Sequence, residues 1–366
     1  MIFNSHAPNS IANSLIPFPR KGIVMKSLRL LIAIAALAAF GSLAYFADEQ
    51  APLGSRMADS AQKLLHLLSD EQKSKCVYSF DDKERVNWIF IPMQDKEKKP
   101  TRKGLRLEQM TDAQQQAVLD LVKTGTSDTG YKQAVTIMSL EQILHDLEKN
   151  GAMVRNPGWY FVTMFGQPAR TGKWGWRIEG HHLSLNFTIV DGEVASATPA
   201  FFGANPAEVK TGDRKGLRVL KDVEDSAREL FQTLDDEQKK AALQAKPFGE
   251  PSQHESAEKV GTPVGIAGAK LNGKQKGLLE QLLKAYTARM PAPVAAAQWK
   301  KVSGDGLDRV YFAYSGGVKD GEPHTYRVQG PSFIVQFLNT QTDAQNNVAN
   351  HIHSAWRELP SDFGLR

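Results

Sequence analysis

The second half of this chain repeats the first, and the repeat constrains the fold more than any other feature of the sequence. Residues 57–73 correspond to 223–239, with many identical positions at a constant offset. The motif W-R-I-E-G at 176–180 returns as Y-R-V-Q-G at 326–330. Helical and strand patterns recur in the same order, which favours an ancestral duplication. We expect two similar units related by a pseudo-two-fold axis, with equivalent surfaces facing each other.

Each half begins with amphipathic helices and continues with strands. Residues 183–190 alternate strictly between apolar and polar side chains, which predicts an antiparallel strand with one buried face. The sequence therefore predicts an α+β fold with halves at 48–215 and 216–366, each a set of helices followed by a small antiparallel sheet. Helix starts are marked by four capping boxes, at Ser69/Gln72, Thr111/Gln114, Asp235/Gln238 and Asn272/Gln275.

The N-terminal segment has the form of a bacterial export signal. Two positive charges follow Met25, an unbroken apolar run occupies 30–40, and small residues follow at Ser42 and Ala44. The apolar run is too short for a comfortable membrane span. We expect 25–47 to be a signal peptide, and 1–24 to be an extension upstream of the true start. The mature protein would be secreted or periplasmic, with no stable membrane span after cleavage. An uncleaved N-terminal anchor is the alternative.

The charge and cysteine content exclude several classes of function. The net charge of +5 is spread over the chain, and no block of lysine and arginine is dense enough for a nucleic-acid groove. The single cysteine, Cys76, excludes an intramolecular disulfide and any CxxC metal site. Cys76 lies in an apolar helical pattern, so we interpret it as a packing residue. The oligomeric state is left open by the sequence.

The two halves differ at their histidines, and this difference predicts a site. The first half contains the pair His181 and His182, and the second half contains the H-x-H motif of His351 and His353. The corresponding positions of the other half hold no histidine in either case. Residues i and i+2 of a strand point the same way, so both imidazoles of H-x-H can reach one metal ion. Gly180 permits a bulge or turn that aims the double histidine at a site. We predict that the two groups meet between the halves, and three imidazoles with an open position suit Zn, Cu or Mn.

Two functions remain open. In the first, an exported metal-dependent hydrolase or oxidase uses these histidines as ligands. Glu179 would then be a general base or would orient a ligand, with Arg177 in support. In the second, Trp174, Trp176 and Arg177 form the surface of a non-catalytic periplasmic module that binds a carbohydrate or an anionic small molecule. The histidines would also be explained if they only satisfied hydrogen bonds or lay on the surface.

Three motifs carry a resemblance to a known family. They are W-G-W-R-I-E-G-H-H-L-S-L-N-F at 174–187, S-A-T-P-A-F-F-G-A-N-P at 196–206 and N-H-I-H-S-A-W-R at 350–357. In these motifs the chain resembles the bacterial family known as domain of unknown function 3500, from about residue 57 to the C-terminus. The resemblance implies an export signal, which members tend to carry, and it implies no activity. Both histidine groups lie within the resembling motifs.

Overall fold

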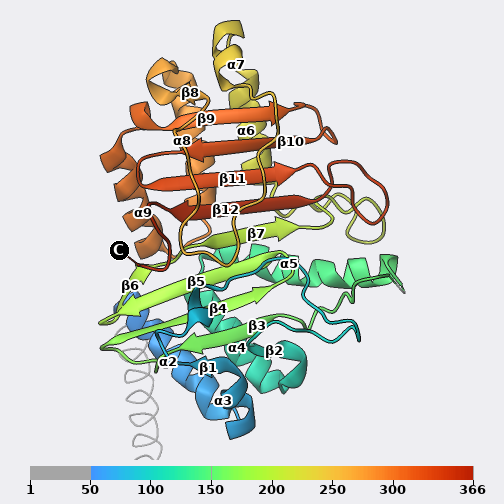
Figure 1. The fold of residues 1–366 in the computed structure, drawn as a ribbon, viewed down its shortest axis with the longest axis vertical. Helices are drawn as coiled ribbons and strands as arrows, with labels where there is room; N and C mark the ends of the chain where they lie inside the picture. Colours follow the sequence, from blue (N-terminus) through green and yellow to red (C-terminus); the bar gives the residue numbers. More distant parts are fainter. Residues whose placement is uncertain (1–50, 150, 366) are drawn as a thin grey trace, which may run out of the picture. The chain divides into compact units, whose positions relative to one another are not determined.

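Twelve strands form one continuous sheet in the computed structural model, which describes residues 51–149 and 151–365. The order along the sheet is β1-β3-β4-β5-β7-β12-β11-β10-β9-β8, with β2 beside β3 and β6 beside β5 (Figure 1). All neighbours are antiparallel except β1 and β3. The strands are β1 (Val77–Tyr78), β2 (Leu105–Arg106), β3 (Phe161–Phe165), β4 (Lys173–Gly180), β5 (Leu183–Val190), β6 (Glu193–Ser196), β7 (Ala200–Ala204), β8 (Ile266–Ala267), β9 (Tyr311–Gly316), β10 (His324–Gln329), β11 (Phe333–Asn339) and β12 (Ile352–Glu358).

Helices precede the main strands in each half, as the sequence predicts. The first set is α2 (Leu53–Leu67), α3 (Asp70–Cys76), α4 (Asp112–Thr124) and α5 (Asp128–Leu147), and the second is α6 (Lys221–Gln232), α7 (Asp236–Ala242), α8 (Gly273–Thr287) and α9 (Ala292–Asp305). Short 3-10 helices lie at Lys83–Val86, Leu107–Gln109, Gly268–Lys270 and Leu307–Arg309. Within the described part of the chain, no helix combines the length and apolar character that crossing a membrane requires. The predicted extension at 1–24 and signal peptide at 25–47 lie outside the described residues.

All four predicted capping boxes are confirmed, and they pair between helices. Each capping side chain accepts the backbone N–H of the glutamine three residues on, and the glutamine oxygen accepts in return. Gln72 then donates to the side-chain oxygen of Gln114 over 3.0 Å, and Gln238 donates to that of Gln275 over 2.9 Å. The same local motif therefore holds α3 against α4 in the first half and α7 against α8 in the second.

The sheet differs from the prediction in one respect, because the two halves do not form separate small sheets. β7, the last strand of the first half, pairs antiparallel with β12, the last strand of the second, and this β7·β12 junction makes the sheet continuous. Backbone hydrogen bonds between edge strands satisfy donors and acceptors that two separate sheets would leave unpaired. Sequence periodicity describes each strand alone and does not show which edges meet.

Both faces of the sheet are buried, which corrects the expectation of a half-exposed strand. Leu185 and Phe187 of β5 pack in the main core on the helix-covered face, whereas the alternating residues face the other side. Figure 1 shows α6 and α8 behind the strands and two extended segments, 79–104 and 244–265, running across the front. These segments bury the polar residues of β5 so completely that Ser184 is 0% exposed. The front has its own apolar cluster, made of Trp88, Phe90, Phe201, Ala355 and Phe363.

Candidate metal centre

His181 and His182 form the two-residue turn between β4 and β5. Gly180 pairs with Leu183, so the histidines alone close the hairpin. His182 has φ of 64°, in the left-handed region that hairpin turns usually give to glycine or asparagine. A side chain there costs on the order of 1–2 kcal/mol. The turn is held in place on both sides, because His182 N–H donates to the carbonyl of Phe90 over 2.9 Å and Gly203 N–H donates to His182 over 2.8 Å.

The H-x-H motif lies where β12 begins, next to the end of β7. His353 is paired with Gly203, and the N–H of His351 donates to the Asn339 side chain over 3.0 Å. Gly203 makes the approach of the hairpin possible: a Cβ atom at this position would lie 2.9 Å from Cδ2 of His182 and 2.8 Å from the carbonyl oxygen of Ile352. The missing side chain lets the imidazole of His182 lie over β7 and reach β12.

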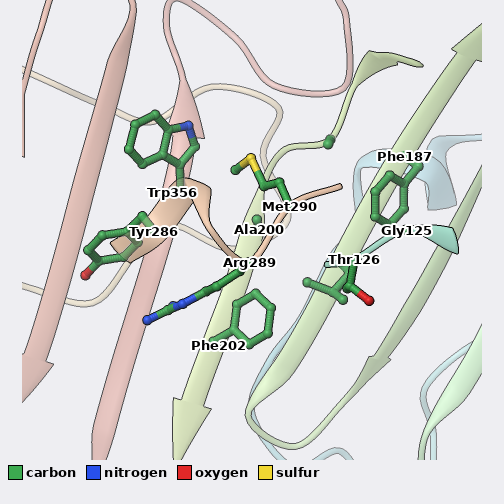
Figure 2. A pocket seen from close by; sticks show the side chains of 11 residues that line it. Gly125, Thr126, Phe187, Ala200, Phe202, Tyr286, Arg289, Met290 and Trp356 are labelled. Carbon is green, nitrogen blue, oxygen red and sulfur yellow. The ribbon is translucent and has the colours of Figure 1, made fainter. Parts of the chain in front are cut away.

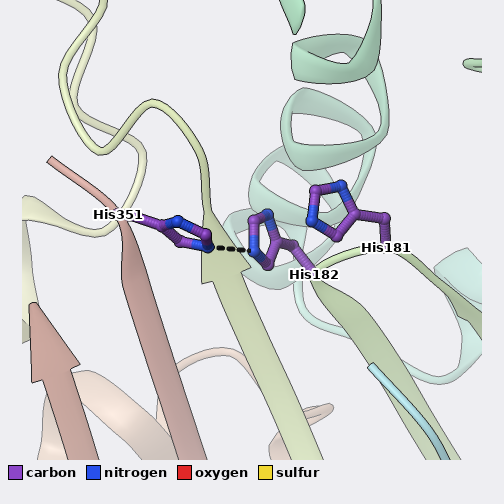
Figure 3. Close-up of side chains that lie close together, drawn as sticks. All are labelled: His181, His182 and His351. Atoms are coloured by element: carbon purple, nitrogen blue, oxygen red, sulfur yellow. Dashed lines mark hydrogen bonds between the residues drawn. The ribbon is translucent and has the colours of Figure 1, made fainter. Parts of the chain in front are cut away.

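The four histidines meet as the sequence predicts, and we call them the histidine cluster. Nε2 of His182 lies 2.8 Å from Nε2 of His351 and 3.1 Å from Nε2 of His353. Ring nitrogens of His181, His182 and His351 lie within 4.8 Å of one another. Figure 3 shows the three side chains close together, with a hydrogen bond between His182 and His351. The rings of His181 and His182 are 3.7 Å apart at their centroids. His182 is therefore the centre of the cluster, and it joins the first half of the chain to the second.

Three converging Nε2 atoms are difficult to satisfy by hydrogen bonds alone. A neutral imidazole nitrogen carries either one hydrogen or one lone pair. Nε2 of His182 can therefore make one well-directed hydrogen bond, but it has two nitrogen neighbours at hydrogen-bond distance. Two nitrogens on a tetrahedral ion at 2.0–2.1 Å lie about 3.3 Å apart. The spacings of His182 from His351 and from His353 are close to this value. The three histidines whose ring nitrogens lie near enough to one another to hold one metal ion are His181, His182 and His351.

Two carboxylates fix the outer nitrogens of the cluster. Oε2 of Glu250 lies 2.6 Å from Nδ1 of His353, and a carboxylate oxygen of Glu141 contacts Nδ1 of His181. A carboxylate accepts a hydrogen, so each contact places the proton on Nδ1 and leaves Nε2 with its lone pair. Carboxylates orient metal-ligating histidines in this way. Nη1 of Arg155 also lies 3.3 Å from Nδ1 of His181.

Neither Glu141 nor Glu250 was predicted from the sequence as a partner of the histidines, although the pattern around Glu141 indicates a buried carboxylate. Glu141 occupies the buried face of α5, among Ile137, Met138 and Leu144. A carboxylate in an otherwise apolar helical stripe needs a partner, because an isolated buried charge is costly. Glu250 lies in the segment between the halves, where composition indicates only an exposed loop. Its role depends on how that segment crosses the sheet, which no local pattern predicts.

Burial keeps three histidines of the cluster, His181, His182 and His351, neutral. Burial lowers the pKa of His351 to about 2, and nearby His353 and His181 add to the shift. The pKa of His182 is lowered well below its usual value, first by burial and then by the neighbouring histidines. Burial also lowers the pKa of His181, against the opposing effect of Glu141. A neutral imidazole is the form that binds metal ions. His181, His182 and His351 are therefore neutral at neutral pH without help from a metal.

Arg177 and Glu179 lie in a buried ion-pair network. Nε of Arg177 is 3.3 Å from Oε2 of Glu179, and Nη1 of Arg102 is 3.3 Å from Oε1. Oε2 of Glu179 also accepts the N–H of Ile89 over 3.1 Å, and Arg177 bonds to the carbonyl and carboxylate of Glu84. Among the described residues, no hydrogen bond or ion pair joins either side chain to the histidine cluster. These contacts attach the segment 79–104 to the sheet. A catalytic role for Arg177 and Glu179 stays a prediction.

The predicted binding surface of Trp174, Trp176 and Arg177 is wrong. Both tryptophans belong to the main core on the helix-covered face, with Trp174 0% and Trp176 1% exposed. Trp176 stacks on Phe187 with ring centroids 4.4 Å apart. Arg177 is fully buried and points to the opposite face. A strand alternates its side chains between two faces, so these three residues cannot share one surface.

Together these features define an α+β protein with four histidines gathered at the junction of its two halves. The chain belongs to the family described as "Protein of unknown function (DUF3500)", which matches residues 50–365. Membership agrees with the resemblance seen in the sequence motifs. Comparison with curated proteins and with solved structures gave no match.

Proposed function

We propose that this protein is an exported metalloprotein whose histidine cluster binds one transition-metal ion between two duplicated halves. The observation that carries the proposal is the approach of Nε2 of His182 to Nε2 of both His351 and His353, at 2.8 and 3.1 Å. These residues come from a hairpin and a strand far apart in the sequence. The left-handed φ of His182 and the space above Gly203 are both needed to bring them together.

The register of the sheet supports the duplication. Trp176 faces Phe187 between β4 and β5, and their counterparts Tyr326 and Phe337 face each other between β10 and β11. At the β7·β12 junction, His353 pairs with Gly203, its own counterpart in the repeat. A two-fold axis between two antiparallel strands relates the residue on one strand to the residue directly opposite it. Because His353 and Gly203 are such a pair, the proposed axis passes between them, beside the histidine cluster. The metal would then lie where the halves meet.

The donor set fits a borderline transition metal. Imidazole nitrogens suit Zn and Cu, whereas Mn prefers a larger share of oxygen ligands. His181, His182 and His351 would be the ligands, with His353, 3.1 Å from Nε2 of His182, as a fourth donor or a flanking group. His351 is the most exposed of the four, which leaves its side of the ion for water or a substrate. A metal held by three imidazoles can activate water or change oxidation state. This supports a hydrolase or an oxidase as the activity.

Metal analysis of tag-free protein tests the proposal. Protein purified from the periplasmic fraction is expected to contain close to one equivalent of Zn or Cu. His182→Ala should lose it, because His182 contacts both partners from the second half. His66→Ala is the matched control, since His66 is exposed on α2 and outside the cluster. Metal-free wild-type protein that also fails to take up added Zn or Cu would overturn the proposal.

Export is tested separately, on the full chain. Cells that express residues 1–366 are fractionated, and the N-terminus of the mature protein is sequenced. We expect the protein in the periplasm or medium, with an N-terminus near residue 48. Cytoplasmic protein with an intact N-terminal segment would contradict export, and it would leave the metal proposal to be judged by the metal analysis.

A further inference from the structure

Asn339 connects the backbone of His351 to helix α6. It is the last residue of β11 and is 2% exposed. Oδ1 of Asn339 accepts the N–H of His351 over 3.0 Å, and Nδ2 donates to Oε1 of Glu224 over 2.8 Å. Glu224 is itself held in place, because it accepts from Arg218 over 2.7 Å and from Arg228 over 2.9 Å. Hydrogen bonds therefore run without a break from α6 to a histidine of the cluster.

His351 needs this contact because it lies just outside the sheet. The pairing of β11 with β12 ends at Asn339 and Ile352, one residue after His351. The preceding residue, Asn350, is held separately, since its Nδ2 donates to the carboxylate of Asp343 over 2.7 Å. The N–H of His351 lies between these two fixed points, and the side chain of Asn339 supplies its acceptor.

Asparagine meets both requirements of this position. A backbone N–H only donates and an ionised carboxylate only accepts, so the side chain between them must offer one acceptor and one donor. Leucine has a similar size and offers neither group. Aspartate would accept from His351 and repel Glu224. The two partners also fix which way the amide of Asn339 is turned.

The first half of the chain has apolar residues at the positions that correspond to this network. Asn339 corresponds to Ile189, and Glu224 corresponds to Ala58. Both apolar residues are fully buried, so packing at this place does not require polar groups. Burying polar groups is costly unless they are hydrogen-bonded. In the second half these bonds lead to His351, which indicates that the network serves the histidine cluster.

We propose that Asn339 is a positioning residue of the histidine cluster, and that its bond to Glu224 fixes the direction in which His351 approaches His182. Nε2 of His351 lies 2.8 Å from Nε2 of His182, so a rotation of the backbone at His351 would carry the imidazole away. The expected effect on metal affinity rests on the proposed metal centre. The expected effect on the backbone of His351 does not.

Hydrogen exchange and zinc affinity of Asn339→Leu test this role. In the metal-free protein, the amide hydrogen of His351 should exchange about 3- to 10-fold faster than in wild type, because its hydrogen bond is lost. Zinc affinity, measured by competition with a chromogenic chelator, should fall about 10-fold or more. Asn339→Ser is the second variant if leucine prevents folding, since a serine side chain is too short to join the two partners.

Tyr286→Phe is the matched control for a lost buried hydrogen bond. Tyr286 accepts from Ser354 of β12 over 2.9 Å, and its hydroxyl lies 2.6 Å from that of Tyr326. It stands beside Trp356 at a small pocket on the helix-covered face (Figure 2). Among the described residues, none of its hydrogen bonds reaches the histidine cluster. Exchange at His351 and zinc affinity should therefore stay within about twofold of wild type.

The proposal is overturned if a folded Asn339 variant exchanges the His351 amide at the wild-type rate, or if Tyr286→Phe has the same effect. Faster exchange with unchanged zinc affinity would also overturn it, because the backbone bond would then not position the imidazole. If wild-type protein binds no added zinc, the metal proposal fails, and the exchange comparison alone decides the role of Asn339.

Discussion

The metal-free protein should lose stability in mild acid because His181, His182 and His351 are held neutral. The pKa of His351 is lowered to about 2 by burial, whereas an unfolded histidine titrates near 6.5. Below pH 6.5 the unfolded chain therefore binds a proton that the folded chain does not, so the free energy of unfolding falls as the pH falls. Between pH 7.5 and 5.5 this one residue should remove about 1.4 kcal/mol. His181 and His182 act in the same direction, since burial lowers both of their pKa values.

Urea unfolding in EDTA at the two pH values measures this effect, with His351→Gln as the matched variant. Glutamine is polar, has a comparable length and does not titrate. Wild-type protein should lose about 1.4 kcal/mol more than the variant on acidification, whatever their absolute stabilities. Equal losses in the two proteins would refute the reasoning, because His351 would then bind protons equally in the folded and unfolded states.

Three further substitutions test separate parts of the structure. Glu250→Gln replaces the charged acceptor for Nδ1 of His353 with a neutral amide and should weaken metal binding about 10- to 100-fold in a competition titration with a chromogenic chelator, without unfolding the protein. Gly203→Ala places a Cβ atom against His182 and should cost about 1–3 kcal/mol in urea unfolding together with metal affinity; a neutral result would show that the close approach is unimportant. Glu179→Gln leaves buried Arg102 without its carboxylate partner and Arg177 with Glu84 alone, and it should destabilise the fold by about 3–5 kcal/mol, whereas lost activity at unchanged stability would indicate a catalytic role instead.

Local chemistry made the helices predictable from sequence. A capping box needs only two side chains three residues apart. The helix start at Ser69 and Gln72, and those at the three other pairs, can therefore be predicted from the local sequence. In the sequence comparison of the two halves, neither histidine group has a counterpart in the other half. That difference is the basis on which their convergence was predicted, and the duplication itself stays a proposal.

Long-range contacts account for what sequence could not predict. The alternation of Ser184, Asn186 and Thr188 indicates an exposed face, yet these residues are buried by segments whose own sequences have no regular period. The segment 244–265, which covers this face of the sheet, also brings Glu250 into contact with His353. Trp174 and Trp176 were assigned to a surface because aromatic and charged residues often form binding sites, but their strand faces the main core. In each case a contact between distant segments decides the environment of the residue.

X-ray absorption spectroscopy of tag-free protein tests the central claim most directly, because it reports the atoms bound to the metal. We expect a fit with three or four imidazole nitrogens at about 2.0–2.2 Å, and the loss of this signal in His182→Ala but not in His66→Ala. A metal surrounded only by oxygen ligands, or a spectrum unchanged by His182→Ala, would contradict a metal centre at the junction of the two halves.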